Sequence, residues 1–229
     1  MKSVSSQTTP RLSIILSVMV IGSIWGLLEM ALGGFLHTIH FVQTGAVMGG
    51  LAISLMALFL SITRKPLLIP ALGVIAASFK PFSALIFGQP VLSPYVINPA
   101  TAIIVEAMAF ATVAFIFNRA IEKHILARAG GGFLAGALGI VFYAAIASAF
   151  GMGKWPMLDM AAKLHTIVNT ATPVALAGAV TMVTGSFIGK LSLRALSDFS
   201  KLYPPLYYAA SMVLVISCWA IPPFFHLKG

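Results

Sequence analysis

The sequence predicts an all-α fold: a polytopic membrane bundle of about seven transmembrane helices, with six as the alternative, and a cytoplasmic N-terminus. Of its 229 residues, 59% are hydrophobic and only 8% are charged, and the mean hydropathy is +1.01. This composition leaves too little polar surface to cover a soluble particle. Apolar stretches near the twenty residues that a bilayer requires also recur along the chain. We therefore expect an integral, multi-pass membrane protein.

Polar segments divide the chain into seven apolar stretches. The predicted spans are 12–36, 42–63, 67–88, 97–118, 131–152, 166–189 and 205–224. The first stretch follows Lys2 and Arg11, as a signal peptide would, but it is too long, contains Glu29 and lacks a convincing cleavage site. We expect it to be retained as a span. No linker or soluble domain interrupts the series, so residues 1–229 are expected to form one helical domain.

The distribution of basic residues predicts the orientation. With the N-terminus inside, the connections on the inner side hold ten Lys and Arg residues and those on the outer side hold three, a bias typical of cytoplasmic loops. The inner set is Lys2, Arg11, Arg64, Lys65, Arg119, Lys123, Arg128, Lys190, Arg194 and Lys201, and the outer set is Lys154, Lys163 and Lys228. Inward-facing basic residues near anionic lipid account for the net charge of +9, so no nucleic-acid partner is expected.

Three ionisable residues lie inside predicted spans: Glu29, Lys80 and Glu106. Such a group costs several kcal/mol in a bilayer unless it is paired or faces water. At about 1.5 Å per residue, all three lie roughly 10 to 14 Å below the outer membrane surface. Lys80 either pairs with one of the carboxylates, which would lock helices together, or extends toward the outer interface. The formal charge of minus one favours a pocket that holds a protonated glutamate or attracts a cationic group.

Polar residues at the predicted outer ends of the helices are expected to ring the mouth of this pocket. The candidates for solute binding are His37, His40, Gln43, Asn98, His165 and Asn169. Gln43, Asn98 and Asn169 each open a similar polar element at the start of a predicted helix. Such residues either cap helix starts or together form a binding rim, as in transporters built from repeated hairpins. The spacing of the histidines is not diagnostic of a metal site, and no metal ligand is assigned.

Two features are candidates for contact with partner proteins. Gly22 and Gly26 match the small-x-x-x-small pattern, which indicates either close internal packing or a face for another membrane subunit. Segments 119–129 and 190–202 are basic and amphipathic, and we expect them to lie on lipid headgroups or to contact a cytoplasmic partner. In the second segment, Arg194 and Lys201 are the candidate partner contacts.

Signatures of catalysis are missing from the sequence. It contains no G-x-S-x-G, no H-E-x-x-H, no phosphate-binding G-x-x-x-x-G-K with Ser or Thr, and no paired aspartates of an intramembrane protease. We expect no enzyme and no cofactor, and ATP-driven transport would need other subunits. The single cysteine, Cys218, excludes an internal disulfide and a cysteine-based metal cage.

Four features are relevant together: the size of the chain, its hydrophobic helical character, the small residues Gly22 and Gly26 on the first helix, and a polar site on the outer side. In these features the chain resembles the substrate-binding S components of energy-coupling factor (ECF) transporters. The resemblance covers the first six spans, and a seventh span departs from the usual six. It implies binding of a vitamin or similar micronutrient, in association with a transmembrane coupling protein and cytoplasmic ATPases. It also implies a bacterial-type inner (plasma) membrane.

The leading hypothesis is therefore a membrane solute-uptake protein, the substrate-binding subunit of a multi-component transporter. One alternative is a self-sufficient proton- or ion-coupled carrier in which Glu29 or Glu106 takes the proton. Another is a haem- or metal-binding membrane protein. Visible absorbance of the purified protein would separate the last from the first two, and co-purification with an ATPase would separate the first from the second.

Overall fold

The computed structural model describes residues 11–86, 88 and 90–226, and the side chains of all of these except 11, 12, 194 and 224–226. This part of the chain is helical, contains no strand, and includes seven helical segments long and apolar enough to cross a membrane. The predicted all-α polytopic fold is confirmed. The long helices are α1 (Arg11–Thr38), α2 (Thr44–Thr63), α5 (Pro94–Lys123), α6 (Ile125–Ala149), α7 (Met160–Leu202) and α8 (Pro204–His226).

The third span is broken in the middle. A single-turn η1 (Pro66–Leu68) leads into α3 (Ile69–Ala77), and α4 (Lys80–Ile86) begins after a turn of two residues. Pro81 follows directly, and because proline has no N–H it cannot continue the hydrogen-bond ladder to the carbonyl of Ala77. The break places Lys80 at the start of a short helix.

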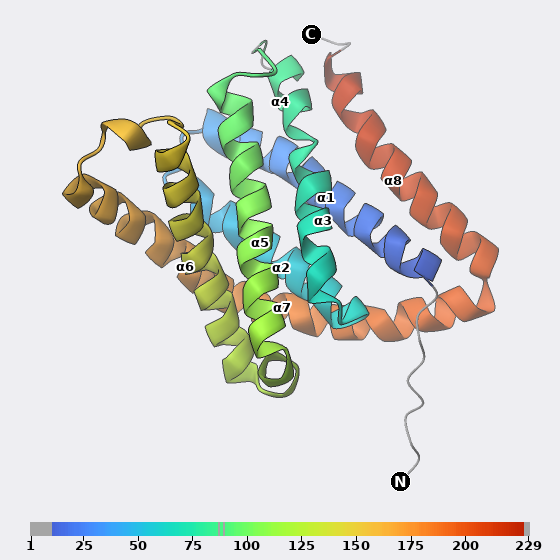
Figure 1. Ribbon diagram of the computed structural model, residues 1–229. Coiled ribbons are helices and arrows are strands. Elements are labelled where there is room, and N and C mark those ends of the chain that lie inside the picture. Colours follow the sequence, from blue (N-terminus) through green and yellow to red (C-terminus); the bar gives the residue numbers. More distant parts are fainter. Residues whose placement is uncertain (1–10, 87, 89, 227–229) are drawn as a thin grey trace.

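Six helices form a closed ring, and the seventh lies outside it. Going round the ring, α1 contacts α3, α3 contacts α5, α5 contacts α6, α6 contacts α7, α7 contacts α2, and α2 returns to α1. Figure 1 shows α8 running beside α1 at the edge of this bundle. Only 11% of the most apolar stretch of α8 is buried in the chain, against 56% for α1. The six-helix ring therefore holds the core, and α8 is a peripheral helix.

Glycines join α2, α6 and α7. A Cβ at Gly132 of α6 would overlap the carbonyl of Gly178 in α7, and a Cβ at Gly178 would lie 2.7 Å from Ile53 of α2. A Cβ at Gly185 would likewise overlap the backbone of Ser54. Backbones approach this closely only where side chains are absent. We call these contacts of Gly132, Gly178 and Gly185 the glycine seam.

On the opposite side, α1 is joined to its neighbours by side chains. The indole N–H of Trp219 in α8 donates to the hydroxyl of Ser23 over 3.0 Å, and the ring of Trp219 lies 4.5 Å from that of Phe79, between their centroids. Phe79 lies in the turn before α4. Together with the Glu29–Lys80 contact described below, these interactions form what we call the side-chain seam.

The possible subunit-docking face at Gly22 and Gly26 is covered by the chain itself. A Cβ at Gly22 would lie 3.0 Å from Ile75 of α3, and one at Gly26 would overlap the ring of Phe79. Both glycines are buried. Their assignment as partner-binding residues is therefore corrected: the small-residue spacing serves internal packing of α1 against α3 and the turn that follows it.

Helix α7 is too long to lie entirely within a bilayer core. Its 43 residues span roughly 64 Å at about 1.5 Å per residue, twice the thickness of about 30 Å. Figure 1 shows it continuing along the lower end of the bundle toward the start of α8. The predicted span 166–189 and the amphipathic segment 190–202 are thus one helix. Segment 119–129 is not a separate surface helix, because α5 runs to Lys123 and α6 begins at Ile125.

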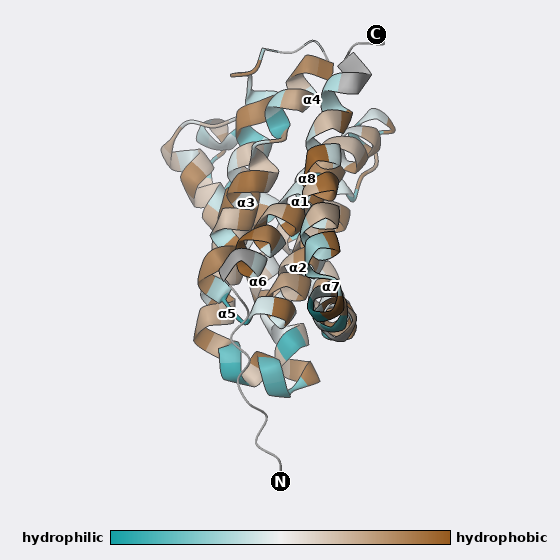
Figure 2. Cartoon of the chain, turned by 90° about the vertical axis from the view of Figure 1, so that its right-hand side faces the viewer, coloured by the Kyte–Doolittle hydropathy of each residue, from teal (hydrophilic) through white to brown (hydrophobic). Residues whose placement is uncertain are grey.

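The hydropathy of the residues changes along the length of the bundle. Figure 2 shows hydrophobic residues along most of the bundle, with hydrophilic residues gathered at the lower end, where α5 meets α6 and along α7. Many large apolar side chains are exposed at the perimeter, such as Phe115, Ile116 and Val180. In a soluble protein this exposure would promote aggregation, whereas in a bilayer it faces lipid. The chain is an integral membrane protein.

Candidate functional site

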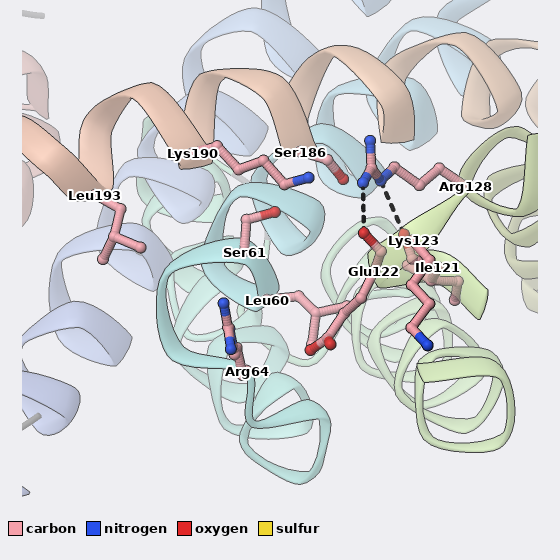
Figure 3. A pocket seen from close by; sticks show the side chains of 10 residues that line it. All are labelled: Leu60, Ser61, Arg64, Ile121, Glu122, Lys123, Arg128, Ser186, Lys190 and Leu193. Carbon is pink, nitrogen blue, oxygen red and sulfur yellow. Dashed lines mark hydrogen bonds between the residues drawn. The ribbon is translucent and has the colours of Figure 1, made fainter. Parts of the chain in front are cut away.

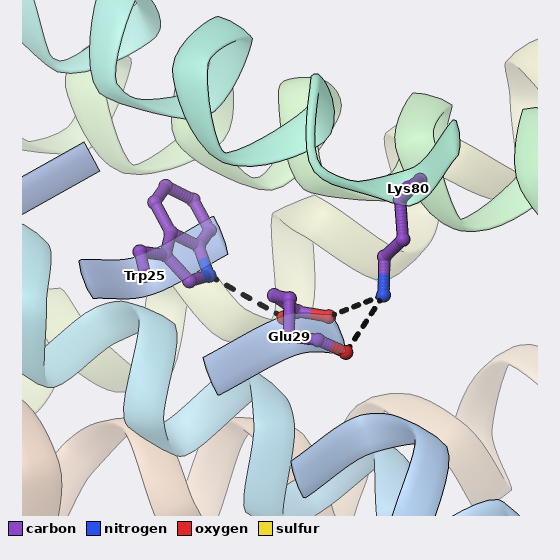
Figure 4. A network of polar contacts seen from close by, with 3 residues as sticks. All are labelled: Trp25, Glu29 and Lys80. Carbon is purple, nitrogen blue, oxygen red and sulfur yellow. Dashed lines mark hydrogen bonds and ion pairs between the residues drawn. The ribbon is translucent and has the colours of Figure 1, made fainter. Parts of the chain in front are cut away.

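The centre of the candidate site is a buried ion pair between α1 and α4. The Lys80 ammonium lies 2.9 Å from Oε2 of Glu29 and 3.1 Å from the backbone carbonyl oxygen of the same residue. Each side chain is only 9% exposed. The expected pairing of Lys80 with a carboxylate is confirmed, and its extension toward the outer interface is excluded. Figure 4 shows the lysine reaching down from α4 to the carboxylate on α1.

Trp25 completes the environment of Glu29. Its indole N–H donates to Oε1 of Glu29 over 3.3 Å, and the side chain is fully buried. Both carboxylate oxygens therefore have a donor, one from Trp25 and one from Lys80 (Figure 4). Trp25 was not among the predicted site residues, although its position four residues before Glu29, about one helical turn, was a usable signal.

Glu106 is the unpaired member of the charged layer. It lies on α5, and its Oε1 atom is wholly buried with no hydrogen-bond partner among the described residues. Two glycines make room for it: the ideal Cβ of Gly49 on α2 would lie 3.1 Å from Oε1, and that of Gly139 on α6 would lie 3.7 Å from Cγ. Val174 of α7 packs at the same point of α2. The carboxyl group therefore lies where four helices meet.

Adjacent residues of α2 connect the ion pair to Glu106. The ideal Cβ of Gly33 would lie 3.7 Å from Cε of Met48, 3.9 Å from Oε2 of Glu29 and 4.0 Å from the Lys80 ammonium. Met48 is thus near the ion pair, and the next residue, Gly49, contacts Glu106. The three ionisable residues form one layer across the ring.

Chemically, this layer has more acceptors than donors. Glu29 is satisfied by Trp25 and Lys80, whereas Glu106 offers a desolvated carboxyl oxygen with no donor. A buried carboxylate oxygen without a donor is strongly unfavourable, which favours a proton on Glu106 or a donor group from a bound molecule at Oε1. The arrangement can therefore bind a cationic or hydrogen-bond-donating group, or carry a proton.

The six polar residues expected at the mouth of the pocket share one end of the bundle but do not form a network. They stand at the C-terminal end of α1 (His37, with His40 just beyond), before α2 (Gln43), and near the starts of α5 (Asn98) and α7 (His165 and Asn169). Among the described residues, the only hydrogen-bonding contact within this set is between Asn169 and His165, which lie on the same helix. The amide nitrogen of Asn169 is 3.2 Å from Nδ1 and 3.1 Å from Nε2 of His165. All but Asn98, which is half-buried, are exposed.

The helix-capping interpretation of the polar elements is wrong for two of the three. Helix α5 begins at Pro94 and α7 at Met160, so Asn98 and Asn169 lie inside helices rather than at their starts. Asp159 caps α7 by accepting a hydrogen bond from the amide of Ala162 over 2.7 Å. Gln43 does occupy the N-cap position of α2, but its side chain makes no cap hydrogen bond.

Two further predictions concern partner contact at Arg194 and Lys201 and the absence of a metal site. Lys201 is exposed on the C-terminal part of α7, and the side chain of Arg194 lies outside the described residues. Their role in partner contact stays a prediction. In the part of the chain that the structure describes, no group of three or more His, Cys, Asp or Glu side chains is placed to hold a metal ion.

A second polar feature was not predicted from the sequence: a cavity at the end of the bundle opposite the six polar residues. The sequence indicated Arg64, Arg128 and Lys190 only as part of the inward basic bias. In the structure they line one cavity, from the end of α2, the first turn of α6 and the interior of α7. Their positions next to predicted span boundaries were the available signal, but which boundaries meet depends on the packing order of the helices.

Comparison of the chain with known protein families, with curated proteins and with solved structures gives no match. The resemblance to ECF S components therefore stays a prediction.

Proposed function

We propose that this protein takes up a small solute across the membrane, as the substrate-binding subunit of a multi-component transporter. The observation that carries the proposal is the buried, unpartnered Oε1 atom of Glu106, a residue that is itself half-buried, in the same layer as the Glu29–Lys80 pair. A purely structural ion pair would need no third charge nearby. Ionisable residues inside a membrane bundle typically mark a solute or ion pathway.

The resemblance to ECF S components supplies the finer proposal. The solute would be a vitamin-like or similar micronutrient, and the partners a transmembrane coupling protein and cytoplasmic ATPases in a bacterial-type inner membrane. The ring of six helices with α8 outside it supports this resemblance, which concerns six spans. The role is one of binding rather than catalysis, and the cytoplasmic part of α7, which holds Lys201, is the proposed contact for partners.

The binding role is tested by mass spectrometry of small molecules retained by the gently purified protein. We expect a small molecule to be retained by the native chain and lost from the Glu106→Gln variant. Asp198→Asn removes one carboxylate from an exposed position on α7 and serves as the matched control, which should retain the molecule. If the native chain and Glu106→Gln retain the same molecules, the charged layer is not the binding site.

The orientation is tested by labelling single cysteines in a chain in which Cys218 has been replaced. Because the basic bias places the starts of α3 and α6 inside, cysteines at positions 64 and 124 should be protected from an impermeant outside reagent, and one at position 158 should be labelled. The reverse pattern would invert the orientation of the bundle and place the charged layer in the inner half of the membrane.

The carrier hypothesis is a second candidate, favoured by the same Glu106 oxygen, because a protonated carboxyl also satisfies a desolvated site. The carrier and the binding subunit differ in the energy source that drives uptake. A binding subunit in liposomes should not accumulate solute under a proton gradient and should do so only with partner subunits and ATP. Gradient-driven accumulation by the purified chain alone would establish the carrier, with Glu106 as the proton site.

A further inference from the structure

A cavity of about 240 Å³ opens at the inner end of the bundle, between α2, α5, α6 and α7. Its lining combines apolar residues with four basic residues, one acidic residue and two serines. The lining residues are Leu60, Ser61, Arg64, Ile121, Glu122, Lys123, Arg128, Ser186, Lys190 and Leu193. The formal charge of this lining is +3. Pockets for drug-sized ligands begin at roughly 300 Å³, so this volume suits a small anionic group.

The basic residues converge without an acidic partner. Arg64, Arg128 and Lys190 line the same cavity, and Glu122 is the single acidic residue in its lining. In the described portion of the chain, none of these three cations has a carboxylate oxygen within 4.0 Å. Like charges brought together from separate helices repel one another, and a bound anion would relieve this repulsion.

One of the three cations is held in place by the backbone. The guanidinium of Arg128 donates from Nε to the carbonyl of Ile121 and from Nη2 to the carbonyl of Glu122, each over 2.8 Å (Figure 3). These carbonyls belong to the last turn of α5, where acceptors are otherwise unsatisfied. Since arginine has five N–H donors, three remain for a ligand. The group is therefore oriented before any ligand binds.

Hydroxyl groups face the same space. Ser186 is only 4% exposed, and Figure 3 shows its hydroxyl between Lys190 and Arg128, with Ser61 on the opposite wall. Neither hydroxyl is joined to another described group by a hydrogen bond, so both can donate to an anion. Cations combined with hydroxyl donors are the typical ligands of a phosphate group.

We propose that this inner cavity binds a phosphate group, with Arg64, Arg128 and Lys190 as its ligands. Basic pockets between transmembrane helices on the cytoplasmic side typically receive the headgroups of anionic lipids. The apolar residues Leu60, Ile121 and Leu193 in the lining would suit the glycerol and first methylenes of such a lipid. The inference is independent of the proposed transport function, because the cavity lies at the end of the bundle opposite the charged layer.

The test compares two sources of phosphate on the full-length chain. Native mass spectrometry in mixed micelles measures retention of phosphatidylglycerol against phosphatidylcholine, and calorimetry measures binding of inorganic phosphate. The double variant Arg64→Gln/Lys190→Gln should weaken binding of the preferred probe about tenfold, because charge-assisted hydrogen bonds are lost. Retention of phosphatidylglycerol alone identifies the lipid as the source, and binding of inorganic phosphate identifies a soluble compound.

The matched control is Lys154→Gln/Lys163→Gln, which removes the same charge from the outer side. It should leave binding within about twofold of the native chain, since those residues lie far from the cavity. An Arg64→Lys/Lys190→Arg chain keeps the charge and should retain the preference, which separates lost binding from lost folding. Equal weakening in both Gln variants would show general electrostatic attraction and overturn the site. Unchanged binding in Arg64→Gln/Lys190→Gln would overturn it too, and would leave the cations free for an acidic protein partner.

Discussion

The glycine seam and the side-chain seam hold the two sides of the bundle together in different ways. In the first, Gly132 and Gly178 bring the backbones of α6 and α7 into direct contact. In the second, α1 meets α4 and α8 through the Glu29–Lys80 ion pair and the Trp219–Ser23 hydrogen bond. Backbone contact depends on shape alone, whereas the polar contacts depend on charge and donor geometry in a low-dielectric interior.

The comparison also separates the two glutamates. Glu29 belongs to the side-chain seam, where both of its oxygens have donors. Glu106 lies beside the glycine-rich packing of α2 and α6, where Gly49 and Gly139 provide space but no donor. One carboxylate therefore has a structural partner in the chain and the other does not. Stability measurements should distinguish the two carboxylates.

Lys80→Met should cause the largest loss of stability. It keeps much of the length of the side chain but leaves Glu29 as an uncompensated buried charge, which typically costs about 3–5 kcal/mol. Chemical unfolding in mixed micelles measures this loss. The double variant Glu29→Gln/Lys80→Met removes both charges and should recover most of it, because the amide oxygen introduced at position 29 can still accept from Trp25. Native-like stability of Lys80→Met alone would mean that the ion pair is not needed to join α1 to α4.

Gly132→Ala should rank second, with a loss of about 1–3 kcal/mol from overpacking. Its new methyl group would overlap the carbonyl of Gly178, and a backbone carbonyl cannot move aside as a flexible side chain can. Gly130→Ala is the matched control, because it lies on the same helix and its Cβ would meet nothing within 4 Å. Comparable thermal midpoints for the two variants would contradict direct backbone contact in the glycine seam.

Trp219→Phe should cost about 1 kcal/mol, the net value of one hydrogen bond, because it preserves an aromatic ring against Phe79 but loses the N–H that Ser23 accepts. A double-mutant cycle with Ser23→Ala isolates this term. We expect the double variant to be less destabilised than the sum of the single variants. Strict additivity would show that α8 is attached by ring packing alone.

Glu106→Gln should have the smallest effect on the ligand-free protein, with stability unchanged or raised by up to about 1 kcal/mol. It replaces a carboxyl group whose buried Oε1 atom has no partner by a neutral group of the same shape, so no hydrogen bond or ion pair among the described residues is lost. Glu29→Gln, measured in the same unfolding assay, should be destabilising, because it breaks the pairing with Lys80. A loss from Glu106→Gln as large as that from Glu29→Gln would remove the distinction between the two carboxylates.

Some of the site was predictable from local sequence. A lysine and two glutamates within apolar stretches at similar depths are visible by counting residues, and the pairing of Lys80 with a carboxylate follows from the energy of a buried charge. Which of the two glutamates pairs with Lys80 was not predictable from the sequence. The choice depends on the turn before Lys80 and on the contact of α1 with α3, which place Glu29 within 2.9 Å and leave Glu106 among glycines.

The helix starts were predicted less well for a similar reason. Asn98 and Asn169 look like caps because Asn is favoured at helix starts, but the helices begin at Pro94 and after Asp159, which precede them. In an apolar chain, any of several polar residues near a span can be the residue at which the helix starts. The choice among them depends on where the helix meets its neighbours and the membrane surface.

Hydropathy and charge along the chain were enough to predict a membrane protein, the number of its apolar spans and the presence of ionisable residues within them. Both properties are summed along each segment and do not depend on its neighbours. Tertiary structure alone decided that Gly22 and Gly26 pack against α3 and the turn after it, that α8 lies outside the ring, and that Arg64, Arg128 and Lys190 share a cavity. These outcomes depend on the order and rotation of the helices. Many rotations bury similar apolar area, so close glycine contacts and a few polar pairs select among them.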